Sequence, residues 1–235
     1  MKHLFAIYNK QLLVSDNNKL ASLSERDANN RIVNILRLSE GDKLIIFDKT
    51  NFYELEISQI TKREIKFTVL DSCKIMRLAP KINLIIGLLK KDNFEKALHN
   101  AALLAIQSVQ PVYTDLIHKN WWADRYLERF ESVMAAACEQ SKNFAMPEIL
   151  PPISLSEYLQ NAPNDLMVCD PNGQSLAKSN LKQSEYSIIV GPEAGFSENE
   201  ISMLEKYSKY SLVNFVLTSY DAVFAAGIII NNYLN

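Results

Sequence analysis

The sequence has 235 residues, with 25 Lys and Arg against 27 Asp and Glu, and therefore a formal net charge of −2. This length suits one large domain or two modest ones. Hydrophobic residues make up 48% and charged residues 22%, a composition that argues against disorder. The near-neutral balance excludes a histone-like nucleic-acid binder but leaves room for a local basic face.

The cysteines, the apolar runs and the N-terminal segment bear on the cellular compartment in which we expect the protein. Cys73, Cys138 and Cys169 are widely spaced and form no CxxC pair, so we expect neither a disulfide framework nor a metal site. The longest apolar run, Ala222–Ile230, is much shorter than the roughly 20 residues of a membrane-spanning helix. The segment Leu4–Tyr8 lacks the pattern of a signal peptide. We therefore expect a cytoplasmic protein without a membrane partner.

The first 80 residues contain short strand-like runs. Period-two alternation or compact apolar character predicts half-buried strands at Leu4–Tyr8, Lys43–Phe47, Tyr53–Ile57 and Ile65–Val69. A single helix is expected within Glu25–Leu38. Residues 1–80 hold 13 basic and 10 acidic side chains, against 12 and 17 in residues 81–235. We therefore expect a small barrel or sheet that is the better candidate for contact with a polyanion.

After Pro80, apolar strands alternate with helices. Strands are predicted at 82–86, 109–113, 166–169 and 187–190. Helices are predicted at 97–106, with Asp92 and Glu95 as a capping box, around 126–137, after the Ser197–Glu200 cap, and from about Asp221. This alternation predicts an α/β domain with a largely parallel sheet.

A glycine-bearing turn, Gly191–Gly195, stands between a predicted buried strand and a capped helix. In α/β sheets, ligands bind at such carboxyl ends of strands, and the next helix offers unpaired N–H groups. Glu193 could hydrogen-bond a ribose, an amine or a base edge. A plain strand-to-helix turn is the alternative interpretation.

Common catalytic motifs are absent from the sequence. It contains neither GxxxxGK[ST] nor GxGxxG, and none of its three histidines lies in a GxSxG or HExxH context. The pair Trp121-Trp122 could stack on bases or fill a core or subunit contact.

Several strings together resemble one family. GPEAGFSENE at Gly191–Glu200 closely resembles the GPEGGFSxxE signature of the bacterial 16S rRNA uridine-N3 methyltransferases, which belong to the SPOUT class. Ile35–Asp48 resembles the family's VLRLxxGDxxxxFDG stretch, and Ala137–Ile149 resembles AxEQSxRxxxPEI. The resemblance covers essentially the whole chain.

This resemblance implies a PUA-like RNA-binding β-barrel over residues 1–75 and a SPOUT trefoil-knot domain over 76–235. It also implies a homodimer that methylates 16S rRNA of the small ribosomal subunit with S-adenosyl-L-methionine. The implied donor-binding residues are Gly191, Pro192, Glu193, Gly195, Val216, Leu217 and Ser219. The residues expected at the RNA are Arg37, Lys90, Lys91 and Tyr220.

The sequence also departs from the family pattern. Thr218 and Tyr220 replace the arginine and glutamate of ILRxET, Asn100 replaces the lysine of KxxELG, and a further family arginine falls at about Leu116. Arginines near N3 could stabilise the anion that forms when uracil loses its proton. A catalytically silent relative that binds rRNA or ribosomal particles is therefore the alternative hypothesis.

Overall fold

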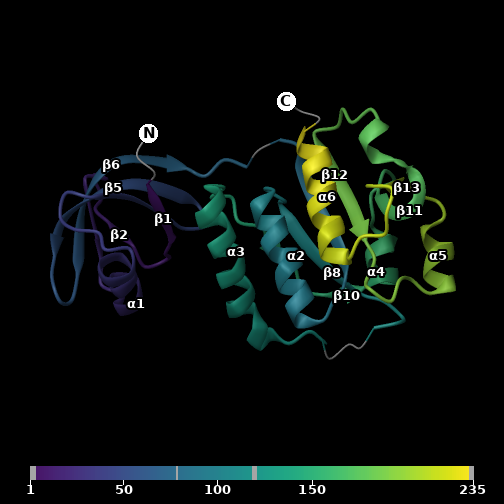
Figure 1. The fold of residues 1–235 in the computed structure, drawn as a ribbon, viewed down its shortest axis with the longest axis horizontal. Helices are drawn as coiled ribbons and strands as arrows, with labels where there is room; N and C mark the ends of the chain where they lie inside the picture. Colours follow the sequence, from purple (N-terminus) through teal and green to yellow (C-terminus); the bar gives the residue numbers. More distant parts are fainter. Residues whose placement is uncertain (1–3, 78, 118–120, 233–235) are drawn as a thin grey trace. The chain divides into compact units, whose positions relative to one another are not determined.

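The computed structural model describes residues 4–77, 79–117 and 121–232 (Figure 1). The chain forms two compact units, and each is described by itself. One consists of residues 1–76 with Glu139–Phe144, and the other consists of Arg77–Cys138 with residues 145–235. The sequence-based division after residue 75 did not anticipate that Glu139–Phe144 joins the N-terminal unit.

The N-terminal unit is built on one sheet. Its described strands are β1 (Phe5–Tyr8), β2 (Leu13–Val14), β3 (Leu20–Leu23), β4 (Lys43–Phe47), β5 (Asn51–Ile60) and β6 (Ile65–Lys74). They lie in the order β1-β4-β5-β6-β3-β2, and β1 pairs with β4 in parallel while the other pairs are antiparallel. Alternate residues of these strands, including Leu44, Ile46, Leu55, Ile57 and Phe67, are buried in one core.

The short helix expected within Glu25–Leu38 is present as a continuous helical segment, but its second half is not α-helical. The structure has a short α-helix, α1 (Arg26–Asn30), followed by a π-helical turn, η1 (Arg31–Ile35). The N–H of Leu36 donates to the carbonyl of Arg31 at 2.9 Å, the wide spacing of a π turn. Arg37 then takes a φ of 55°, a left-handed conformation that ends the helical segment.

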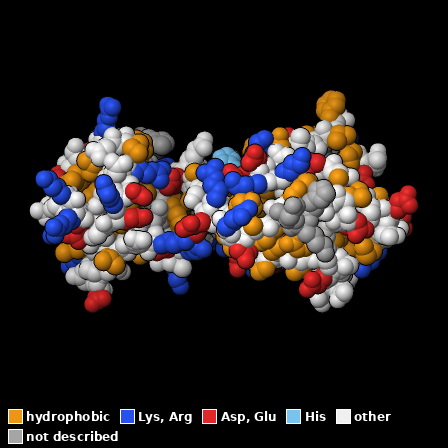
Figure 2. Space-filling model, turned by 90° about the horizontal axis from the view of Figure 1, so that it is seen from below, with side chains coloured by type: hydrophobic (Ala, Val, Ile, Leu, Met, Phe, Trp, Pro, Cys, Tyr) orange, Lys and Arg blue, Asp and Glu red, His pale blue; other side chains and the backbone are white. Residues whose placement is uncertain are grey.

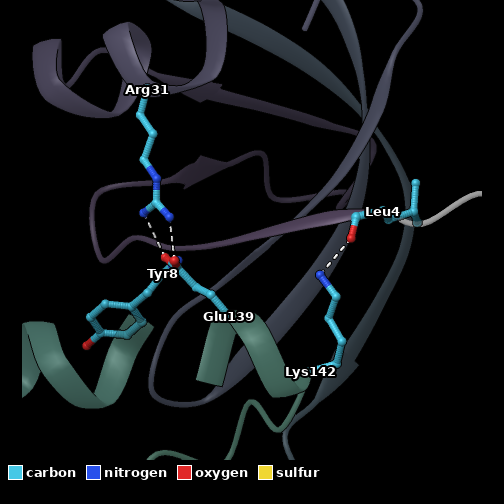
Figure 3. A network of polar contacts seen from close by, with 5 residues as sticks. All are labelled: Leu4, Tyr8, Arg31, Glu139 and Lys142. Atoms are coloured by element: carbon cyan, nitrogen blue, oxygen red, sulfur yellow. Dashed lines mark hydrogen bonds and ion pairs between the residues drawn. The ribbon is translucent and has the colours of Figure 1, made fainter. Parts of the chain in front are cut away.

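The segment Glu139–Phe144 is held to the N-terminal unit by polar contacts (Figure 3). The carboxylate of Glu139 accepts two hydrogen bonds from the Arg31 guanidinium, at 2.9 and 2.5 Å, and one from the N–H of Tyr8 at 2.8 Å. Lys142 donates to the carbonyl of Leu4 at 2.6 Å. Glu139 thus joins the edge strand β1 and the π turn, two segments that are far from it in sequence.

The C-terminal unit is an α/β domain with a parallel sheet, as predicted. Its described strands are β7 (Lys81–Gly87), β8 (Ser108–Tyr113), β9 (Glu148–Ile149), β10 (Ile153–Ser154), β11 (Met167–Ser175), β12 (Glu185–Val190) and β13 (Ser208–Ser211). They lie in the order β10-β8-β7-β12-β11-β13, with β9 beside β8, and every described pair is parallel. β7 and β12 are central and buried on both faces, which explains their continuous apolar runs.

Helices cover this sheet (Figure 1). They are α2 (Lys91–Leu103), α3 (Leu127–Ser141), α4 (Leu155–Gln160), α5 (Glu198–Leu204) and α6 (Ser219–Asn232), with short 3₁₀ turns η3 (Asp124–Tyr126) and η4 (Leu176–Lys178). α2 packs beside α6, whereas α4 and α5 contribute to one apolar cluster with the sheet. Among the described residues, no helix is long and apolar enough to span a membrane.

One predicted helix start is confirmed and another is wrong. Ser197 and Glu200 form a reciprocal capping box at the start of α5. α2 instead begins after Lys90, without a side-chain cap. Asp92 therefore lies inside the first turn of the helix rather than at its cap position, and Glu95 binds Arg129 of α3 at 2.9 Å.

Candidate active site

A cavity of about 590 Å³ opens at the carboxyl end of β12 and beside the middle of β11, at Cys169–Pro171. All seven residues predicted to hold the methyl donor line it: Gly191, Pro192, Glu193, Gly195, Val216, Leu217 and Ser219. Two segments separated by about twenty residues, the loop after β12 and the segment before α6, therefore meet here. This meeting is a geometric finding, and the binding role of each residue stays a prediction.

The loop after β12 depends on glycine at two places. Gly195 has a φ of 75°, and its N–H donates to the carbonyl of Pro192 at 2.9 Å, which closes a tight turn. A Cβ atom at Gly195 would meet nothing within 4 Å, so the backbone is open on that side. Gly87 of β7 lies against Pro192, and a Cβ there would come within 2.4 Å of the proline ring. Gly195 thus permits the turn, and Gly87 permits the close contact between Pro192 and the neighbouring strand β7.

The start of α6 is tied to the loop. Ser219 is buried, and its hydroxyl donates to the carbonyl of Gly191 at 2.7 Å. The hydroxyl of Thr218 accepts from the N–H of Asp221 at 3.3 Å and donates to the Asp221 carboxylate at 2.6 Å. Thr218 therefore caps α6, and its hydroxyl is committed to the helix rather than to the cavity.

Polar contacts also fix the other side of the loop. Asn93 of α2 donates to Glu193 at 2.6 Å. Glu200 is only 2% exposed and accepts from the N–H groups of Ser197 and Asp115, at 2.8 and 2.9 Å. The loop after β8 is thereby bound to the start of α5. A set of side chains, rather than chain geometry alone, holds the loops around the cavity.

The cavity combines apolar and polar walls. Phe215 and Val216 are 79% and 82% exposed and line the cavity, so they offer uncovered apolar surface to a ligand. Asp170 and Glu193 provide carboxylates. Burial raises the pKa of the Cys169 thiol to about 12, so this cysteine is protonated at neutral pH and is not a nucleophile.

The residues expected at the RNA lie outside this cavity. Tyr220 lines a second cavity of about 630 Å³ between α2, α3 and α6, together with Lys96, His99 and Asn100. Lys90 and Lys91 stand at the start of α2, and the exposed Arg37 belongs to the N-terminal unit.

Sequence reasoning missed part of the donor cavity wall. Asp170 follows the buried part of β11, where a bulge interrupts pairing with β13, and Tyr210 belongs to β13. The Asp170–Gly173 stretch has turn composition after an apolar strand and could have indicated this bulge. β13 reads SKYS, which carries no strand pattern.

Family comparison agrees with this architecture. The RNA methyltransferase domain family matches residues 76–231, and the RNA methyltransferase PUA domain matches residues 32–70. The chain belongs to the RNA methyltransferase family. The PUA match confirms the predicted PUA-like character of the N-terminal sheet.

Several relatives of this RNA methyltransferase are named ribosomal RNA small subunit methyltransferase E. This chain is 30% identical to the ribosomal RNA small subunit methyltransferase E of Helicobacter pylori. The match covers 75% of this chain and 78% of the relative. The chain is 26% identical to the protein of that name from Rickettsia conorii, over 83% and 80% of the two chains. The fold matches the Neisseria gonorrhoeae enzyme of that name, solved bound to S-adenosyl methionine, with a TM-score of 0.81, 22% identity and 98% of each chain covered.

Proposed function

We propose that the protein transfers the methyl group of S-adenosyl-L-methionine to N3 of a uridine in 16S rRNA of the small ribosomal subunit. The observation that carries this proposal is the cavity at the carboxyl end of β12, because all seven predicted donor-binding residues line it in an RNA methyltransferase domain. Relatives named ribosomal RNA small subunit methyltransferase E support the substrate class. The uridine-N3 position comes from the sequence resemblance.

The residues of the cavity fit such a donor. A volume of about 590 Å³ lies in the range of small-molecule sites, about 300–1,000 Å³. The exposed side chains of Phe215 and Val216 suit the flat adenine, and the open backbone at Gly195 allows close approach. The carboxylates of Asp170 and Glu193 suit the hydroxyl and ammonium groups. When bound, the donor supplies an activated methyl group on a sulfonium, so no metal is needed.

The protein's task is then mainly positioning. Ser219 holds the loop at Gly191, and Asn93 holds Glu193, so the donor-binding walls are fixed before substrate arrives. A uracil must lose its N3 proton to attack, which favours cations near the base. Lys90 and Lys91 stand at the end of β7, next to β12, and we assign them to substrate RNA together with Tyr220 and the exposed Arg37.

Two further features belong to this proposal. A trefoil knot around the donor site is implied by the family resemblance. A homodimer is supported by α6, whose outer residues Phe224 and Ile228 are apolar and exposed although the helix also buries Val223, Ala226 and Ile230. The site of action would be the cytoplasm, where small subunits are found.

One observation favours the alternative of a silent rRNA-binding relative. Among the described residues, those lining the donor cavity include no Lys or Arg. Thr218, at the position of a family arginine, is used as a helix cap, and Leu116, near another, is an exposed apolar side chain. Removing one charge-stabilising donor costs enzymes about 10²–10³ in rate, so several losses could silence transfer.

The deciding experiment measures transfer of labelled methyl groups from S-adenosylmethionine to small subunits that lack 16S uridine-N3 methylation. We expect incorporation at N3 of one uridine. A folded protein that binds these subunits without incorporation would contradict the proposal and support the silent relative. Calorimetric titration with S-adenosylmethionine reports on the donor site independently of transfer, so donor binding without transfer would support the silent relative.

A further inference from the structure

A group of aromatic and basic side chains lies near the start of α2, outside the linings of both cavities. Its outer members are Trp121, Trp122, Tyr126, Lys90, Lys91 and Arg125, which we call the aromatic–basic platform. Trp121, Trp122 and Tyr126 are partly exposed, and the three cations are exposed. On the face of the C-terminal unit seen in Figure 2, Lys and Arg side chains lie among hydrophobic ones.

Buried rings support this platform from below. Phe94 and Phe130 are each 1% exposed and lie 5.0 Å apart between ring centroids. Trp122 packs on both, at 6.0 and 5.8 Å, and Tyr126 packs on Phe130 at 6.0 Å. The core role for aromatic residues is thus filled by the two phenylalanines, and Trp122 and Tyr126 are held on them with part of their surface uncovered.

Cations lie over the outer rings. The ammonium of Lys90 is 5.9 Å from the centre of a Trp121 ring, Lys91 is 5.4 Å from Tyr126, and the Arg125 guanidinium is 5.1 Å from Tyr126. Contacts of this kind are weak at exposed sites, so a base can replace a cation on a ring while the cation moves to a phosphate. Rings alternating with cations are the pattern with which proteins bind single-stranded nucleic acid.

The platform and the donor cavity lie at the same end of the sheet, where β7 and β12 have their carboxyl ends. Lys90 follows β7, and β7 pairs with β12, which leads into the donor loop. Gly87 of β7 touches Pro192 of that loop, and Asn93 in the first turn of α2 donates to Glu193. RNA held on the platform is therefore beside the mouth of the cavity.

We propose that the aromatic–basic platform binds unpaired nucleotides that flank the methylated base, by stacking on Trp121 and Trp122 and by phosphate contacts from Lys90 and Arg125. The proposal rests on the proposed function in that rRNA is the ligand. The platform gives the protein a cation, Arg125, nine residues after Leu116, where the family arginine is missing.

The two tryptophans of the platform are the only ones in the sequence, so tryptophan fluorescence, excited at a wavelength that tyrosine does not absorb, reports on this site alone. We would titrate the full chain, without donor, with a single-stranded uridine octamer and with an RNA duplex. The single strand should quench the fluorescence saturably and more strongly than the duplex. Trp121→Ala should weaken binding by about 5- to 150-fold, the range measured for one stacked base. Lys90→Gln should make the slope of log affinity against log salt shallower by about 0.7.

A matched control is Lys206→Gln, because Lys206 also lies over an aromatic ring, that of Tyr207, at 4.9 Å. It should leave affinity and salt slope unchanged. The proposal would be overturned if Trp121→Ala bound the octamer as tightly as the unmodified chain, or if the duplex quenched the fluorescence as strongly as the single strand. It would also be overturned if the fluorescence changed on dilution of the protein and RNA did not alter that change. This third outcome would assign Trp121 and Trp122 to a contact between copies of the chain. Methyl transfer without oligomer binding would reject the platform alone, and quenching without transfer would reject the proposed activity alone.

Discussion

The Glu139 carboxylate offers a test of how the N-terminal unit is held together. It accepts three hydrogen bonds, two of them from the charged guanidinium of Arg31, and its side chain is only 9% exposed. The same contacts raise the pKa of Arg31 above its ordinary value, against the opposing effect of burial. Glu139→Gln keeps the shape but removes the charge and one accepting oxygen. Hydrogen bonds to charged groups contribute about 1.5–3 kcal/mol each.

The Arg31 side chain is 41% exposed, so its guanidinium regains water in the variant. We therefore expect the free energy of unfolding to fall by about 1.5–2 kcal/mol, near the lower end of that range. Hydrogen exchange of the Phe5–Tyr8 amides, followed by mass spectrometry, should accelerate by about 10- to 30-fold. Glu128→Gln, an exposed change on the same helix α3, is the control and should alter stability by less than about 0.5 kcal/mol. Unchanged exchange in β1 of the Glu139 variant would refute the reasoning.

Three further predictions concern the C-terminal unit. Ala105→Gly should stabilise the protein by about 1 kcal/mol, seen as a rise of about 2–4 °C in thermal unfolding, because Ala105 has a φ of 55°; an unchanged or lower midpoint would contradict this. Gly195→Val should add about 1–3 kcal/mol of backbone strain at a φ of 75° and weaken S-adenosylmethionine binding in calorimetry by tenfold or more, whereas unaltered affinity would exclude this turn from the donor site. The pKa of Glu95 is lowered from 4.5, chiefly by the hydrogen bond from Arg129, so its contribution is present above pH 4.5 and is lost as pH falls through the lowered pKa. In Arg129→Gln the fall in unfolding temperature between pH 6 and pH 3 should accordingly be smaller than in the unmodified chain, and an equal fall would argue against the pair.

Local pattern was enough to predict the strands that form the centre of each sheet. Leu84–Ile86 and Ile188–Val190 are apolar throughout because β7 and β12 are covered on both faces. The edge strand β13 escaped prediction because its pairing with β11, and not its composition, makes it a strand. This contact joins distant segments, and no local window of sequence contains it. The Asp92–Glu95 cap failed for a local reason, because α2 begins at Lys91 and Asp92 lies inside its first turn.

In the candidate site, too, local features could be predicted and contacts between distant segments could not. The glycine turn and the capped helix α5 were predicted from spacing, because a turn and a cap are local structures. That Ser219 reaches back to Gly191, or that Glu200 binds the loop after β8, could not be predicted, because each contact joins segments brought together only by the fold. Glu139 lies in a string that resembles a family motif, and the structure gives its carboxylate a structural partner in Arg31.

The charge that is missing at family positions is partly present one helical turn away. Asn100, in place of a family lysine, donates to the carbonyl of Tyr220 at 2.8 Å and so keeps α2 joined to the start of α6. Lys96 precedes Asn100 by four residues and therefore lies on the same helix face, and its ammonium is 4.6 Å from the centre of the Tyr220 ring. A cation thus remains beside position 220 although the motif lysine is gone. Comparison of the motif position by position shows a lost lysine here, whereas the structure shows a cation one helical turn earlier on the same helix face.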